Sequence, residues 1–237
     1  MIRVAVVGAL GRMGSTVCQA VEDDPDTELV ARVDEGDNLQ DILDAGADVA
    51  VEFSTPTSVK RNTKWLLERG VHVVVGATGM SDDDIEELRA LTGSANCFVA
   101  PNFAVGAVLM MMFAQQAAKH MPTVEITELH HDRKVDAPSG TALRTAKLIG
   151  AARSSSVAVP GPDGHPARGD VVDGVPIHSV RLPGLVASQE VLFGAEGQTL
   201  SIRHDSIDRS SFMPGVLLAV KAVASRPGLT IGLEHLL

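Results

Sequence analysis

The chain has 237 residues, enough for one or two domains of ordinary size, each with its own buried core. Its 45% hydrophobic and 21% charged residues are typical of a globular protein and exclude a disordered one. The 20 Lys and Arg against 30 Asp and Glu leave a net charge of −10. This balance disfavours general nucleic-acid binding, which needs a basic surface to displace the counterions of phosphate groups.

Neither export nor membrane insertion is expected. The longest apolar stretch, residues 103–114, is shorter than the ~20 residues that a membrane-spanning helix needs. The first residues, MIRVAVVG, are typical of a buried strand rather than of a secretory signal. Cys18 and Cys97 lie far apart and match no metal or redox spacing, so a disulfide has little support. We therefore expect a cytoplasmic protein without a membrane partner.

Short apolar segments alternate with helix-like segments over the first part of the chain. Strands are expected at residues 2–7, 29–34, 48–54, 71–76 and 96–103, and helices at 12–23, 57–70 and 81–93. Ser81 and Asp84 have the spacing of a capping box at the start of the last of these helices. The alternation predicts βαβ units, and hence an α/β fold with a doubly wound, Rossmann-like parallel sheet.

The pattern changes near residue 104. Helices are expected at 104–120, from Thr141 and at 213–225, strands at 124–131, 177–182, 189–193 and 198–203, and a loop at 154–170. The consecutive Met residues 110–112 are expected to pack in a core. We predict a dinucleotide-binding domain at 1–103, completed by 211–237. An α+β domain for substrate binding and oligomerisation, with a largely antiparallel sheet, is predicted at 104–210.

The sequence GALGRMG follows the first expected strand and places Gly8, Gly11 and Gly14 before a helix. Glycines in this context permit a tight turn and let the backbone approach a pyrophosphate at the helix N-terminus. Asp34 ends the second strand, where an acid accepts hydrogen bonds from the adenosine ribose of a dinucleotide. The spacing is G-x-x-G-x-x-G and not G-x-G-x-x-G, so a plain glycine turn beside a solvated Asp is the alternative.

Three further strand ends carry small, polar or turn residues: FSTP at 53–56, GATG at 76–79 and APNF at 100–103. Each alone is an ordinary turn. Ligands of an open parallel sheet bind outside the carboxyl ends of its strands. Together these segments are therefore expected around a nicotinamide ring.

The segment ELHHDRKVDAPSGTA, residues 128–142, gathers His130, His131 and Lys134 just before a helix start. Adjacent histidines on a strand point to opposite sides, and no Cys or further His stands at ligand spacing, so no metal site is expected. The pattern indicates a proton donor with cationic recognition of a carboxylate, assisted by the helix start at Gly140 and Thr141. A surface His-His-Lys turn is the alternative.

GALGRMG, EFSTP, APNFAVG and above all ELHHDRKVDAPSGTA resemble the dihydrodipicolinate reductase family, also called 4-hydroxy-tetrahydrodipicolinate reductases. The resemblance spans essentially the whole chain. It implies an oxidoreductase that reduces 4-hydroxy-tetrahydrodipicolinate to tetrahydrodipicolinate with NADH or NADPH in diaminopimelate and lysine biosynthesis. It also implies a homotetramer assembled through the sheet of the second domain.

The resemblance also assigns residues. His130 matches the proton donor of the family, and Lys134 its catalytic lysine. Substrate-binding positions match His131, Gly140 and Thr141. Cofactor contacts match Gly8, Ala9, Leu10, Gly11, Arg12, Met13, Asp34, Gly76, Ala77, Thr78, Ala100, Pro101, Asn102 and Phe103. Many members carry Thr at the position of Ala77, and close relatives can carry Lys at that of Leu10, so a hydroxyl and a phosphate contact are expected to be lost.

The residues near Asp34 predict a preference for NADH without exclusion of NADPH. Glu35 adds a second negative charge where the 2′-phosphate of NADPH would lie, and no cation follows directly. Arg12 and Arg32 are the nearest cations that could offset this charge.

Two rival functions share the same first domain. Another Rossmann-type dehydrogenase of a small carboxylate would leave the segment 128–142 unexplained. A dinucleotide-sensing module without turnover would bind NADH but not oxidise it.

Overall fold

The computed structural model describes residues 1–153 and 165–237. They divide into a first unit, residues 1–105 and 209–237, and a second unit, residues 106–208. Of the loop expected at 154–170, residues 154–164 lie outside the described residues. Its remainder contains a short 3-10 helix, η1 (Pro166–Arg168), and the start of a strand.

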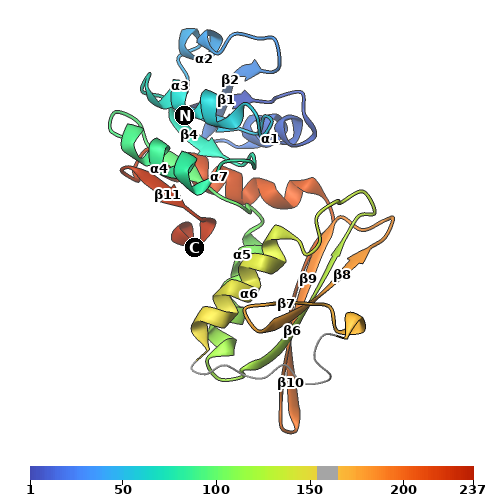
Figure 1. Ribbon diagram of the computed structural model, residues 1–237. Coiled ribbons are helices and arrows are strands. Elements are labelled where there is room, and N and C mark those ends of the chain that lie inside the picture. The colour runs from blue at the N-terminus through green and yellow to red at the C-terminus, as the bar shows by residue number, and fades with distance from the viewer. Residues whose placement is uncertain (154–164) are drawn as a thin grey trace. The chain divides into compact units, whose positions relative to one another are not determined.

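The first unit is built on a six-stranded parallel sheet in the order β11-β5-β4-β3-β1-β2 (Figure 1). Its strands are β1 (Ile2–Val7), β2 (Thr27–Val33), β3 (Val49–Glu52), β4 (His72–Val75), β5 (Cys97–Val99) and β11 (Leu229–Ile231). The central strands are almost entirely buried because helices cover both faces, as their Val-rich composition predicts. The predicted Rossmann-like sheet is confirmed.

Helices pack on both faces of this sheet. They are α1 (Arg12–Asp23), α2 (Gln40–Asp44), α3 (Val59–Leu67), α4 (Asp82–Leu91) and α7 (Met213–Val223). Ile42 of α2, Leu66 of α3 and Leu88 of α4 share one core cluster with strand valines. The helices α1 and α7 contact each other. In addition, α1 contacts β1, and α7 contacts β4. The predicted capping box of α4 is present, since Ser81 and Asp84 bond reciprocally.

The strand β11 was not predicted, and it closes the sheet with a segment from the other end of the chain. Asn96, just before β5, attaches this segment: its Nδ2 donates to the carbonyl oxygens of Val223 and Ala224 at 3.0 and 3.1 Å. Its Oδ1 accepts the N–H of Gly228 at 3.1 Å. One side chain therefore joins β5 to the turn between α7 and β11.

The second unit contains a five-stranded sheet in the order β10-β9-β6-β8-β7, with only the β6–β8 pair parallel. Its strands are β6 (Thr123–His130), β7 (Asp170–Val172), β8 (Val175–Arg181), β9 (Ala187–Ala195) and β10 (Gln198–Ser206). The helices α5 (Val105–Ala118) and α6 (Gly140–Ala152) lie on one side of this sheet (Figure 1). Buried and half-buried residues alternate along β6, as expected of a sheet covered on one face. Of the three consecutive Met residues predicted to pack in a core, Met110 and Met111 are buried, whereas Met112 is half-buried.

Candidate active site

The loop between β1 and α1 brings backbone atoms into close approach. Gly8 has a φ of 79°, and a Cβ there would lie 2.7 Å from the carbonyl oxygen of Phe53. A Cβ on Gly14 would lie 1.9 Å from the carbonyl oxygen of Gly8, so α1 packs directly against the loop. Gly11 is the N-cap of α1 and donates its N–H to the carbonyl of Gly8 at 3.0 Å. The glycines thus let the loop backbone lie close to the electropositive N-terminus of α1.

Asp34 lies beside this loop at the end of β2. Its Oδ2 accepts the N–H of Leu10 at 2.6 Å, and its Oδ1 accepts the N–H of Glu35 at 2.8 Å. A cavity of about 670 Å³ opens at this point, within the usual range for small-molecule sites. It is lined by Gly8 and Gly11, by residues 33–39, and around the start of α3 by Phe53, Ser54, Thr55, Thr57, Ser58, Arg61, Asn62 and Trp65.

The other predicted cofactor residues follow strands of the same sheet. Residues 76–78 follow β4 and residues 100–103 follow β5, so both segments lie at the sheet edge where β1 ends. A Cβ on Gly76 would lie 2.2 Å from the ring of Phe53, whose centroid is 6.1 Å from that of Phe103. The structure therefore brings these segments together. Arg12 and Met13 begin α1, Ala9 is buried, and the side chain of Leu10 is exposed.

In the second unit, the predicted segment 128–142 runs from the end of β6 to the first turn of α6. His130 is the last residue of β6, and Ser139 is the N-cap of α6. The Oγ of Ser139 accepts the N–H of Ala142 at 3.2 Å. Gly140 and Thr141 are the first residues of α6, so they lie at a helix start as predicted. His131 directly follows β6, and its buried Nδ1 has no hydrogen-bond partner among residues 1–153 and 165–237.

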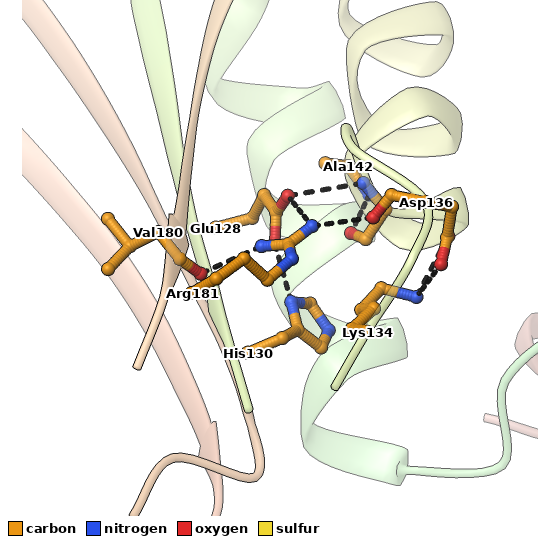
Figure 2. Close-up of polar contacts among 8 residues, drawn as sticks. Glu128, His130, Lys134, Asp136, Ala142, Val180 and Arg181 are labelled. Carbon is orange, nitrogen blue, oxygen red and sulfur yellow. Dashed lines mark hydrogen bonds and ion pairs between the residues drawn. The ribbon is translucent and has the colours of Figure 1, made fainter. Parts of the chain in front are cut away.

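The side chain of Glu128 is fully buried beneath this segment (Figure 2). Its Oε2 lies 2.5 Å from Nδ1 of His130, and Arg181 approaches its two oxygens through two nitrogens at 2.8 and 2.9 Å. The N–H of Ser139 donates to Oε1 at 3.3 Å. Burial alone would raise the pKa of Glu128, but the hydrogen bonds from His130 and Arg181 outweigh it and lower the pKa to about 2. Glu128 is therefore an ionised, fully bonded carboxylate.

Lys134 is paired with the nearby Asp136 (Figure 2). Its Nζ lies 2.7 and 2.8 Å from the two carboxylate oxygens, and this bond lowers the pKa of Asp136. The Asp136 side chain is 60% exposed, whereas that of Lys134 is 21% exposed. The ammonium group that was predicted to bind the substrate is thus paired with an exposed carboxylate.

Glu128 and Arg181 were missed when the sequence was considered alone. The alternation along β6 could have identified Glu128, because Glu128 shares the buried face of this strand with Val124 and Ile126. A charged residue at a buried strand position needs a partner. Arg181 carried no such signal. It lies opposite His130 only through the parallel register of β6 and β8.

Two negative findings hold for the described part of the chain. No helix there is long and apolar enough to span a membrane. No group of three His, Cys, Asp or Glu side chains in residues 1–153 and 165–237 is arranged to hold a metal ion.

Comparison with known proteins gives matches over the full chain. The family models for the N-terminus and the C-terminus of dihydrodipicolinate reductase match residues 2–103 and 106–237. The 4-hydroxy-tetrahydrodipicolinate reductases of Mycolicibacterium vanbaalenii and Cutibacterium acnes are 54% and 56% identical, over 100% of this chain and 99% of each relative.

Solved structures agree. A dipicolinate-bound dihydrodipicolinate reductase from Paenisporosarcina sp. TG-14 matches with a TM-score of 0.90 and 41% identity over 100% of both chains. An amine dehydrogenase from Mycobacterium smegmatis, at 14% identity and a TM-score of 0.68, shares the fold alone. With family models covering both units and relatives more than half identical, the chain belongs to the dihydrodipicolinate reductase family and is a reductase.

Proposed function

We propose that the protein reduces 4-hydroxy-tetrahydrodipicolinate to tetrahydrodipicolinate in diaminopimelate and lysine biosynthesis. Conversion of the 4-hydroxy compound to the product removes one oxygen as water and consumes two electrons and two protons. NADH or NADPH, when bound, supplies the hydride. The observation that carries the proposal is the second-unit site, where His130 is held by an ionised Glu128 close to Lys134.

The first unit fits a dinucleotide. Its glycine loop has no room for side chains at Gly8 and Gly14, as a close pyrophosphate requires, and Asp34 lies beside the cavity. The backbone of residues 8–13 would hold the phosphates, and residues 76–78 and 100–103 would surround the nicotinamide. Asp34 would accept hydrogen bonds from the adenosine ribose.

The cavity favours NADH over NADPH. Asp34, Glu35 and Asp37 line it, and a 2′-phosphate would meet their negative charges. Arg32 is paired with Glu22 at 2.5 Å, which directs its charge to α1. Arg61 is the cation that lines the cavity, so NADPH is expected to bind more weakly but not to be excluded.

His130 would donate the proton that completes reduction of the ring, because an imidazolium group transfers protons readily near neutral pH. Lys134, together with the helix start at Gly140 and Thr141, would hold the carboxylates of the substrate. His131 would complete this contact. The Paenisporosarcina relative has been solved with dipicolinate, a planar dicarboxylate, which supports a dicarboxylate site in this chain.

The further features of the family are proposed on the same basis. A homotetramer would be assembled through the sheet of the second unit. Light scattering behind size-exclusion chromatography measures this state. The cytoplasm is the expected location, with neither a metal cofactor nor a nucleic-acid partner.

The decisive test follows NADH oxidation with aspartate semialdehyde, pyruvate and the upstream synthase. Turnover is expected with either dinucleotide, with the higher kcat/KM for NADH. His130→Gln should lower kcat by about 10²–10⁴-fold and change substrate KM much less. Absence of turnover would contradict the proposed reaction, whereas wild-type kinetics in His130→Gln would contradict the proton donor.

A further inference from the structure

The contact between His130 and Glu128 determines which imidazole nitrogen carries a fixed proton. Glu128 is an ionised carboxylate, so its Oε2 can only accept a hydrogen bond. At 2.5 Å, Nδ1 of His130 must therefore donate. A neutral imidazole then keeps its lone pair at Nε2, and this is the nitrogen that can gain and release the transferable proton.

Arg181 is the second half of this arrangement (Figure 2). Its guanidinium group binds both oxygens of Glu128 in a planar fork, a geometry that fixes direction as well as charge. Nη2, which donates to Oε1 of Glu128, also donates to the carbonyl oxygen of Asp136 at 2.7 Å. Nη1, which donates to Oε2, also donates to the carbonyl oxygen of Val180 at 2.7 Å. Arg181 thus ties the carboxylate behind His130 to the segment that carries Lys134.

We propose that Glu128 and Arg181 are positioning residues for proton transfer. Glu128 holds His130 in the Nδ1–H tautomer. Arg181 fixes the position of Glu128 relative to the segment that carries Lys134. This inference rests on the proposed role of His130 as the proton donor. Neither residue touches the reacting atoms. The pair carries no net charge, so a protonated His130 adds one positive charge beside a buried carboxylate.

The charged surroundings of His130 come from three parts of the second unit. Its own strand β6 contributes Glu128, β8 contributes Arg181, and the following segment contributes Lys134 and Asp136. On the neighbouring strand β9 the residue opposite His130 is Ala187, and alanine has no ionisable group. Glu128 is the group in direct contact with the imidazole, so its removal should change the tautomer of His130 most.

The chain offers a matched control on the same strand. Glu125 accepts from Nε2 of His178 at 2.8 Å and pairs with Arg168, which repeats the Glu–His–Arg combination. Its side chain is 32% exposed, whereas that of Glu128 is fully buried. Glu125→Gln makes the same chemical change outside the segment 128–142.

The first experiment measures the tautomer directly. The ¹⁵N shifts of histidine-labelled protein, with His130 assigned by loss of its signals in His130→Gln, show which nitrogen carries hydrogen at high pH. The Nδ1–H form is expected in the wild-type chain. An Nε2–H form there would overturn the inference, whether or not any variant folds.

The second experiment compares Glu128→Gln with Glu125→Gln. In Glu128→Gln we expect the Nε2–H tautomer to appear and kcat to fall about 10²-fold, with substrate KM changed less than about threefold. Glu125→Gln should leave tautomer and kcat unchanged.

Other outcomes separate the possible failures. A loss of kcat in Glu128→Gln with an unchanged tautomer would reduce Glu128 to a structural role and overturn the inference. Wild-type tautomer and wild-type kcat in Glu128→Gln would overturn it as well. Wild-type turnover in His130→Gln would instead remove the proton donor, and with it the proposed function on which the inference rests.

Discussion

Glu52 places a fully buried carboxyl group at the end of β3, directly before the cavity-lining Phe53 and Ser54. Its Oε1 accepts the N–H of Ser54 at 2.7 Å, whereas its Oε2 has no hydrogen-bond partner among the described residues. Burial raises the pKa of Glu52, and the hydrogen bonds from Ser54 offset this only in part. The folded chain therefore keeps a proton there to higher pH than the unfolded chain. Stability from this group is lost as the pH rises from 4.5 through the raised pKa.

Glu52→Gln should stabilise the fold at neutral pH, because it keeps the acceptor for Ser54 and removes the ionisable group. We expect a gain of about 1 kcal/mol in the free energy of unfolding, or about 2–4 °C in Tm. Urea unfolding at several pH values measures it, with the exposed Glu68→Gln as control. The gain should shrink as the pH falls to 4.5. An equal gain at all pH values would contradict the assignment to a buried charge.

Asp136 competes with a substrate carboxylate for Lys134, if that lysine binds substrate as proposed. Asp136→Asn should therefore lower substrate KM by up to about fivefold, the range of a partly exposed ion pair, and added salt should reduce the difference. Steady-state kinetics at two ionic strengths test this. Asp205→Asn is the control, since Asp205 pairs with Arg203 at the same spacing on β10. An unchanged or raised KM would show that Asp136 does not compete.

Among the elements, β11 depends most visibly on one side chain. Asn96→Ala removes three hydrogen bonds that join the start of β5 to residues 223–228. We expect a loss of about 1–3 kcal/mol in the free energy of unfolding, because backbone groups lose their partners. Hydrogen exchange should accelerate in residues 224–231 before it does in β1. Uniform acceleration over the whole first unit would contradict a local attachment, and Asn38→Ala serves as an exposed control.

The elements show why the fold was largely predictable. Longer apolar or alternating runs, such as those of β1 and β6, carry their periodicity within the segment itself. β11 has three residues and α2 has five, too few for a period to be visible. Their existence depends on a neighbour, because β11 pairs with β5 and α2 packs Ile42 into an existing core.

The site was predictable to the extent that its chemistry is local in sequence. Gly8, Gly14 and Asp34 follow from a strand–turn–helix pattern, and His130 and Lys134 lie in one short segment. The pair of Glu128 and Arg181 could not be predicted, because it depends on the register between β6 and β8. Arg61 and Trp65 line the cavity through the placement of α3, which no local pattern specifies.

The chain as a whole contains one tryptophan, and that residue lines the proposed cofactor cavity. Arg69 covers its ring at 4.1 Å from the centroid. NADH binding should quench Trp65 emission and transfer energy to the reduced nicotinamide. Titration should give a lower Kd for NADH than for NADPH, and Arg61→Ala should widen this ratio by removing the cation. Equal Kd values for both dinucleotides would contradict the acidic discrimination, and Trp65→Phe identifies the signal.

The first unit is assembled from both ends of the chain, and this has a consequence during synthesis. When residues 1–105 have left the ribosome, the edge of β5 opposite β4 has no neighbour, because β11 is translated only after the whole second unit. A nascent chain at this stage presents an open strand edge, the type of surface that pairs with other chains. Polysomes crowd many such nascent chains together. Residues 209–237 therefore protect the open edge of β5 within the same chain. Because these residues are translated last, chaperone binding is most useful while the second unit is being translated.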